Sequence, residues 1–173
     1  MIVVVAGVAA SGKSTVGTLI AARLGWPFTD GDALHPAANV AKMHAGHALN
    51  DADRRPWLAA VTERIDGYLE AGESAVVACS LLRRRYRDEI TAGRPSVRIV
   101  FLDVSREVLT ERLRARHGHF FPAALLDSQL AILEPPQPGE RLLVVAETGQ
   151  PPAVIADEVM RRLQLLPDRK SVV

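Results

Sequence analysis

The stretch Gly7-Val8-Ala9-Ala10-Ser11-Gly12-Lys13-Ser14 constrains this chain most, because it fits the phosphate-loop pattern G-x-x-x-x-G-K-[ST]. A short apolar run, Ile2–Ala6, precedes it and is typical of a buried strand. From Lys13 to Leu24 apolar residues recur at helical spacing. Strand, glycine loop and helix in this order form a concavity of backbone N–H groups that binds anions. A chance Gly-Lys-Ser turn is the alternative, but it explains neither flanking element. We therefore predict a nucleoside triphosphate site.

Within this loop the side chains have distinct expected roles. Lys13 is predicted to reach the β- and γ-phosphates as a catalytic residue, and the Ser14 hydroxyl is predicted to contact Mg²⁺. The residues expected to hold ATP are Gly7, Val8, Ala9, Ala10, Ser11, Gly12, Lys13, Ser14, Thr15 and Arg112.

Length and composition limit the other classes of function. The chain of 173 residues fits one domain, and its formal charge of +1 gives no field that would attract nucleic acid or an anionic membrane. The apolar N-terminal run stops at Gly7, too soon to span a bilayer, and no basic flank precedes it. The single cysteine, Cys79, excludes an internal disulfide and suits a reducing compartment. We expect a cytoplasmic protein with neither nucleic acid nor membrane as partner.

Strand-like and helix-like segments alternate along the chain, which predicts an α/β fold with a parallel sheet and helices on both faces. After the first strand and helix, residues 33–50 show an irregular pattern, and Asp53 is the expected N-cap region of a helix that starts at Arg55 or Pro56 and ends at Ala71. The further predicted strands are 26–30, 74–79, 97–102 and 141–146, and the further predicted helices are 82–92, 105–116, 123–133 and 152–165.

Two carboxylates follow the second predicted strand. Asp30 and Asp32 stand where open α/β sheets bind ligands, and two residues apart in an extended chain their side chains share a face. Phosphoryl transfer to an alcohol needs a carboxylate for the hydroxyl proton and help in placing Mg²⁺. We assign Asp32 to the acceptor and Asp30 to the metal. A pair of turn-forming aspartates around Gly31 is the alternative, and Asp103 is a rival metal ligand that also suits a helix start.

Arginines are the next candidates. Arg84 has Asp88 at i+4, and Arg85 has Glu89, whereas Arg83 has Arg87. This like-charged pair, with Tyr86 nearby, is what an anionic substrate requires, although a basic solvated face is the alternative.

A second arginine pair precedes a helix-breaking segment at 117–122, which could form a flap. Arg112 and Arg116 stand at i and i+4, and they could stack on the base or stabilise charge on the transferred phosphoryl group. A solvated helix face is the alternative. His117 and His119 lack a third metal-ligand partner and suit flap contacts or plain surface better than a metal site.

The chain resembles the gluconate kinase (gluconokinase) family of P-loop kinases. The resemblance covers almost the whole chain, and its most particular runs are Asp-Gly-Asp-Ala-Leu-His-Pro at 30–36 and Asn-Asp-Ala-Asp-Arg-Arg-Pro-Trp at 50–57. It implies ATP-dependent phosphorylation of D-gluconate at its 6-hydroxyl, a five-stranded parallel sheet, a substrate-binding region near 35–70, a lid near 117–135 and a homodimer. The substrate-binding residues it implies are Asp32, His35, Arg54, Arg83, Tyr86, Arg87, His119 and Gln129.

Within that resemblance, the guanidinium groups of Arg54, Arg83 and Arg87 suit the gluconate carboxylate, and Asp32, His35 and Gln129 suit its hydroxyls. The chain also departs from the family. Ala10 replaces a usual glycine, which is tolerable only with a negative φ, and Arg83 replaces a common lysine. Residues 145–150 read Val-Ala-Glu-Thr-Gly-Gln where Val-Asp is frequent, which leaves the adenine contacts open.

Three other functions are alternatives for a chain of this kind. A shikimate-kinase-like or other sugar-acid P-loop kinase shares the Asp-x-Asp after the second strand. A GTPase-type switch requires Asp-x-x-Gly and Asn-Lys-x-Asp, which the sequence lacks. A nucleic-acid kinase requires a basic groove, against which the near-zero net charge argues.

Overall fold

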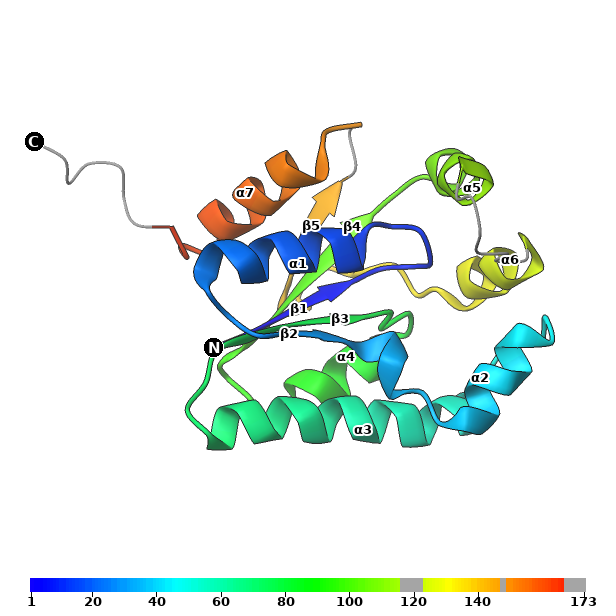
Figure 1. Cartoon of the computed structure of the whole chain (residues 1–173), viewed down its shortest axis with the longest axis horizontal. Coiled ribbons are helices and arrows are strands. Elements are labelled where there is room, and N and C mark those ends of the chain that lie inside the picture. Colours follow the sequence, from blue (N-terminus) through cyan, green and yellow to red (C-terminus); the bar gives the residue numbers. More distant parts are fainter. Residues whose placement is uncertain (116–122, 147–148, 167–173) are drawn as a thin grey trace, which may run out of the picture.

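A parallel sheet lies at the centre of the computed structural model, which describes residues 1–115, 123–146 and 149–166 (Figure 1). Its strands are β1 (Ile2–Ala6), β2 (Phe28–Asp30), β3 (Ala75–Cys79), β4 (Val97–Asp103) and β5 (Leu142–Ala146). They lie in the order β2-β3-β1-β4-β5, and every neighbouring pair is parallel. The predicted five-stranded parallel sheet is thus confirmed.

Helices cover both faces of this sheet. On one face α1 (Lys13–Leu24) and α7 (Pro152–Arg162) pack on a core that includes Val3, Val5 and Val100. On the other face α3 (Asp51–Glu70) and α4 (Arg84–Thr91) pack on a second core, which includes Ile2, Val4 and Val77. Alternate residues of β1 therefore point into opposite cores, as the period of a strand requires. The strand is apolar throughout because both of its faces are buried.

Shorter elements gather at the carboxyl ends of the strands. They are the 3-10 turn η1 (Gly31–Leu34) and the helices α2 (Ala37–His44), α5 (Arg106–Ala115) and α6 (Ala123–Ile132). In Figure 1, α2, α5 and α6 lie beyond the phosphate loop that joins β1 to α1. This is the edge at which open α/β sheets bind ligands. Across the described residues, no helix is long and apolar enough to cross a membrane.

The region between β2 and α3 differs from the prediction. The irregular pattern of 33–50 hides η1 and α2, and α3 begins at Asp51 rather than at Arg55 or Pro56. The earlier start follows from a capping box, in which the Asn50 side chain accepts from the Asp53 N–H (2.9 Å) and the Asp53 side chain accepts from the Asn50 N–H (2.8 Å). Pro56 lies inside α3 rather than in a first turn.

Candidate active site

The phosphate loop ends in the first turn of α1. Gly12, the N-cap, has φ 93° and offers no side chain to cap the helix, so the loop leaves the first-turn N–H groups to an anion. Gly7 is required for packing, since a Cβ there would lie 2.5 Å from the Ser11 Oγ. That hydroxyl is buried and has no protein partner, so it is a polar group for which a ligand could supply the missing hydrogen bond. The Lys13 side chain is 9% exposed.

Ser14 and Asp30 meet beside this loop. The Ser14 hydroxyl donates to the Asp30 Oδ2 at 3.1 Å, although the two residues come from different elements. A hydroxyl and a carboxylate are oxygen ligands of the kind that Mg²⁺ prefers, and Mg²⁺ usually takes few protein ligands beside phosphate and water. The residues present thus fit the expected cation, and the contact favours Asp30 over Asp103, which lies exposed at the end of β4.

Asp32 also faces the phosphate loop, but its backbone conformation differs from the predicted one. It lies in η1 rather than in an extended chain, and the Asp30 Oδ1 accepts from its backbone N–H at 3.0 Å. Its carboxylate lies 3.9 Å from the Lys13 Nζ and is 55% exposed. Gly31 makes this turn possible, because a Cβ there would lie 2.4 Å from the carbonyl oxygen of Ala78 on β3. The turn therefore presents the Asp32 carboxylate to both Lys13 and solvent.

An aromatic stack forms the next part of the site. The His35 ring lies 4.7 Å from the Trp57 ring at an interplanar angle of 10°, and the Trp57 Nε1 donates to the Gly31 carbonyl at 2.8 Å. The Asn39 side chain bonds the His35 Nδ1 at 3.2 Å. Burial lowers the pKa of His35, against the opposing effect of the Asp32 charge. The neutral ring is therefore favoured, and it can exchange hydrogen bonds with hydroxyl groups.

Arg54 is a buried cation beside this stack. The residue is 7% exposed, and its positive charge acts to lower the pKa of His35 and opposes the burial that raises the pKa of Tyr86. The carboxylate of the adjacent Asp53 instead pairs with Lys42 at 2.6 Å. In the described part of the chain, no carboxylate lies within ion-pair distance of the Arg54 guanidinium.

In Arg87, by contrast, all three guanidinium nitrogens donate hydrogen bonds to the protein. Its Nε and one terminal nitrogen donate to the two Glu140 carboxylate oxygens at 2.7 and 3.0 Å, and the other terminal nitrogen donates to the carbonyls of Leu81 and Leu82. The two charged side chains are 2% and 3% exposed. The expectation that Arg87 is unpaired is therefore wrong, because Glu140, distant in the sequence, supplies its counter-charge. Its role in substrate binding stays a prediction.

The other α4 side chains converge on Asp51, at the start of α3. The Arg83 Nε lies 3.3 Å from the Asp51 carboxylate, and Tyr86 and Arg85 bond the same group. These contacts lower the pKa of Asp51 to about 2, Arg85 having the largest effect, while burial raises the pKa of Tyr86. Arg83 also lies 3.5 Å from Glu134. The predicted partner of Arg85, Glu89, is thus wrong. Tyr86 bonds Asp51, and Arg83 has two carboxylates within ion-pair distance, although its buried Nε has no hydrogen-bond partner among the described residues. Their roles in substrate binding stay predictions.

Arg84 pairs with Asp88 at 3.6 Å, as expected. The buried Cys79 belongs to the core, and burial raises the pKa of its thiol.

Two side chains reach the phosphate loop from α5 and α6. Arg112 donates to the carbonyls of Ala10 (3.4 Å) and Ser11 (3.3 Å), so it lies at the phosphate loop, and its predicted contact with the nucleotide stays a prediction. The Gln129 Oε1 accepts from the Ala9 N–H at 2.7 Å, so this oxygen is occupied by the loop rather than by a sugar hydroxyl. Ala10 has φ 63°, which contradicts the expected negative value.

Three of the remaining predicted residues belong to a segment that the structure does not describe. Arg116, His117 and His119 lie outside the described residues, as does most of the expected flap. Thr15 is exposed on the first turn of α1.

Three residues that organise the site carried no predicted role. Trp57, Asn39 and Lys42 hold the Asp30–Pro36 turn and the start of α3 together, and Asn39 also donates to the Asp53 carbonyl at 2.8 Å. Trp57 belongs to the run 50–57 that the resemblance singles out, but no residue type among the three suggests catalysis. Their partners lie far away in the sequence, which spacing along the chain does not reveal.

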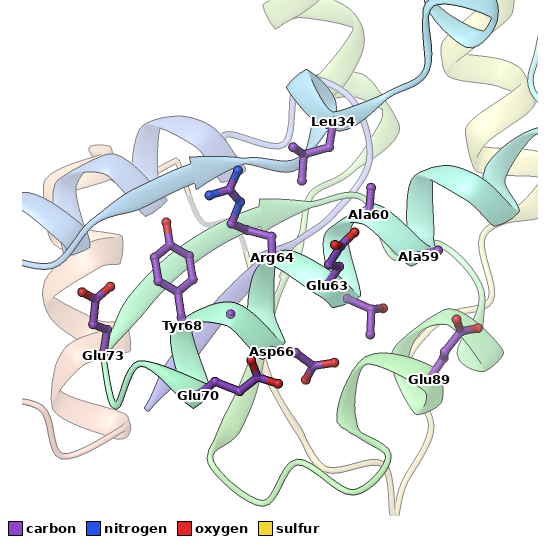
Figure 2. Close-up of a pocket in the computed structure, with 12 residues that line it drawn as sticks. Leu34, Ala59, Ala60, Glu63, Arg64, Asp66, Tyr68, Glu70, Glu73 and Glu89 are labelled. Atoms are coloured by element: carbon purple, nitrogen blue, oxygen red, sulfur yellow. The ribbon is translucent and has the colours of Figure 1, made fainter.

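A pocket on α3 is lined by no residue of the phosphate loop (Figure 2). Its lining comes largely from α3 and includes the acidic side chains of Glu63, Asp66 and Glu70. No residue predicted to bind ATP or substrate lines it. Negative charge of this kind repels a sugar acid or a triphosphate, so the pocket is not part of the candidate active site.

Comparison with known proteins gives a consistent set of matches. The model of the AAA domain family matches residues 2–136. The gluconokinase of Gluconobacter oxydans (strain 621H) is 46% identical over 162 residues, which cover 93% of this chain and 90% of that protein.

Solved structures agree with these matches. A gluconokinase from Sinorhizobium meliloti 1021 is similar with a TM-score of 0.83 and 46% identity, covering 94% of this chain and 91% of that one. An unliganded sugar kinase from Janibacter sp. HTCC2649 is similar with a TM-score of 0.88 and 42% identity, covering 96% and 95%.

Proposed function

This chain belongs to the gluconokinase family, and on that premise we propose that its cleft transfers the γ-phosphoryl group of ATP to the 6-hydroxyl of D-gluconate. ATP-dependent phosphorylation of gluconate is the activity that the relatives support. The shikimate-kinase-like alternative is not favoured, because the matches at 46% identity over nearly the whole chain are gluconokinases.

The burial of Arg54 without a carboxylate partner among the described residues is the observation that supports the substrate assignment. A buried guanidinium without a carboxylate partner is costly unless a ligand supplies the counter-charge. The gluconate carboxylate supplies it, and it can accept two parallel hydrogen bonds from the planar group. With Arg83 and Arg87 bound to Asp51 and Glu140, we assign the substrate carboxylate to Arg54.

The sugar chain then extends from Arg54 past His35 towards Asp32. The neutral His35 exchanges a hydrogen bond with a sugar hydroxyl. Asp32 accepts the proton of the 6-hydroxyl as its oxygen forms a bond to the γ-phosphorus and the bond from that phosphorus to the bridging oxygen breaks. The proximity of Lys13 to Asp32, 3.9 Å, supports this arrangement, since one cation serves the phosphates next to the acceptor carboxylate.

Mg²⁺, when bound, neutralises phosphate charge and orients the triphosphate. Ser14 and Asp30 would hold it. The phosphate-loop amides and Lys13 bind the phosphates, and Arg112 steadies the loop through its carbonyls.

Further assignments rest on the family resemblance. We propose that Arg116 stabilises charge on the transferred group, that His119 contacts substrate, and that a lid near 117–135 excludes water. We also propose a single domain over 1–173, a substrate-binding region near 35–70, a cytoplasmic location and a homodimer, which sedimentation equilibrium would test.

A panel of acceptors tests the activity. ADP release from ATP is measured with D-gluconate, shikimate and nucleoside monophosphates. Turnover with gluconate alone is expected, and no release with gluconate at saturating ATP would refute the proposal.

The variant Asp32→Asn tests the mechanism. It should lower kcat by about 10²- to 10⁴-fold while ADP affinity stays within about twofold. Asp88→Asn, on the surface of α4, is the matched control and should be close to wild type. A normal kcat for Asp32→Asn would move the role of base to another residue.

A further inference from the structure

Ala10, at the tip of the phosphate loop, has a backbone conformation that alanine does not favour. The Ser11 N–H donates to the Val8 carbonyl at 3.2 Å, which closes a turn with Ala10 as its third residue at φ 63°. Turns with a positive φ at this position normally take glycine. Because Ala10 carries a Cβ, the turn is strained and depends on contacts from elsewhere in the chain.

Those contacts come from two helices that lie far away in the sequence. On α6, the Gln129 Oε1 accepts from the Ala9 N–H at 2.7 Å, which fixes the peptide group that precedes Ala9. On α5, Arg112 donates to the carbonyls of Ala10 and Ser11, which fixes the two peptide groups after Ala10. The strained residue is therefore held on both sides by side chains of distant helices.

Packing holds α6 in place for this contact. Leu125 and Leu126 are 7% and 3% exposed, and Leu126 joins the core beneath α1 and α7. The neighbouring Ser128 bonds only within its own helix, to the Leu125 carbonyl at 2.8 Å. Among the described side chains of α6, Gln129 is the one that hydrogen-bonds to the phosphate loop.

We propose that Gln129 is a positioning residue for the nucleotide: its hydrogen bond to Ala9 holds the phosphate loop in its binding conformation and offsets the strain of alanine at position 10. The role deepens the proposed function, since it rests on the nucleotide site. It does not depend on which acceptor the enzyme phosphorylates. Gln129 here acts through the loop, and not by contact with the sugar.

Three variants test this role. They are Gln129→Met, which keeps the side-chain length but removes the hydrogen-bond acceptor, Ala10→Gly, and the double variant that combines the two. Ser128→Ala is the control. The dissociation constant for ADP is measured by calorimetry with Mg²⁺ and without gluconate, and KM is measured for ATP and for gluconate. Gln129→Met should weaken ADP about fivefold, the effect of one neutral hydrogen bond, with the KM for gluconate within about twofold. Ser128→Ala should bind ADP like wild type.

The combination with Ala10→Gly is the decisive comparison. Glycine reaches a positive φ without support, so in the Ala10→Gly background Gln129→Met should change ADP affinity by less than about twofold. This comparison remains valid if Gln129→Met alone fails to fold, because Ala10→Gly relieves strain.

Three results would overturn the proposal. They are unchanged ADP affinity in a folded Gln129→Met, an increase confined to the KM for gluconate, and a loss of ADP affinity that persists undiminished with Ala10→Gly. If ADP binding follows the expected pattern but gluconate is not phosphorylated, the acceptor assignment fails and the role of Gln129 stands.

Discussion

Two regions of the molecule each bury an arginine, and they differ in whether a carboxylate of the protein pairs with it. In the first turns of α3, Arg54 is 7% exposed without a carboxylate partner among the described residues, and in α4 the 2%-exposed Arg87 forms a two-pronged ion pair with Glu140. Both are buried arginines within the substrate-binding set that the family resemblance implies. The difference teaches that burial alone does not mark a ligand site. A buried charge whose partner is missing points to a ligand, whereas a paired one stabilises the fold.

The largest expected effect belongs to Arg87. Arg87→Met should destabilise the fold by about 3–5 kcal/mol, because it leaves the Glu140 carboxylate buried without its partner. Chemical denaturation measures this loss. The double variant Arg87→Met with Glu140→Leu should recover most of it, since two apolar side chains leave no charge unpaired. If Arg87→Met keeps wild-type stability and raises the KM for gluconate, Arg87 binds the substrate and does not stabilise the fold.

Arg54 should show the opposite pattern. Arg54→Ala should lower kcat/KM for gluconate by about 10²- to 10³-fold, because the substrate carboxylate loses its counter-charge in a desolvated site. Its unfolding free energy should stay within about 1 kcal/mol of wild type, since no protein carboxylate is left unpaired. Steady-state kinetics and denaturation of the same preparation measure both. A large loss of stability with unchanged kinetics would make Arg54 structural as well.

Asp51 joins the two regions, because it begins α3 and receives Tyr86 and Arg83 from the β3–α4 region. Its side chain is 42% exposed, so solvent screens these interactions. Asp51→Asn should therefore cost about 1 kcal/mol or less, with a rise of about two- to threefold in the KM for gluconate as α3 loses one anchor. An effect on kinetics as large as that of Arg54→Ala would place Asp51 in direct contact with the substrate.

The smallest expected effect is a pH dependence from Glu140. The Arg87 hydrogen bonds hold the pKa of Glu140 below its ordinary value of 4.5, so the folded state binds fewer protons than the unfolded state near that pH. The stabilisation is therefore complete above about pH 4.5 and is lost as the pH falls through the lowered pKa. Denaturation between pH 3 and 6 measures it. The double variant at 87 and 140 should show a shallower decline, and an equal decline would exclude this pair as its source.

Much of the fold could be predicted from the sequence because its signals are local. Apolar runs such as Ile2–Ala6 and the glycine loop after it specify a buried strand and a phosphate site within a few residues. The start of α3 could also have been found, since Asn50 and Asp53 have the spacing of a capping box. Pro56 obscures this signal, because a proline so far inside a helix is disfavoured.

The partners of the arginines could not be predicted in this way. The sequence presents Arg83 and Arg87 as an unpaired set because only neighbours on one helix are visible in it. Their counter-charges come from Asp51, Glu134 and Glu140, which the fold brings to α4 from other segments. The conformation of Ala10 is a similar case, because Gln129, which bonds the neighbouring Ala9, lies 120 residues further along the chain.

The discrimination between D-gluconate and its uncharged amide, D-gluconamide, tests the central assignment most directly. Both molecules carry the same hydroxyls, so the ratio of their kcat/KM values isolates the carboxylate. Wild type should favour gluconate by about 10²-fold or more, and Arg54→Ala should reduce this preference to within about threefold, while a folded Arg87→Met/Glu140→Leu should keep it. If Arg54→Ala keeps the full preference, the carboxylate binds elsewhere and the assignment of Arg54 is contradicted.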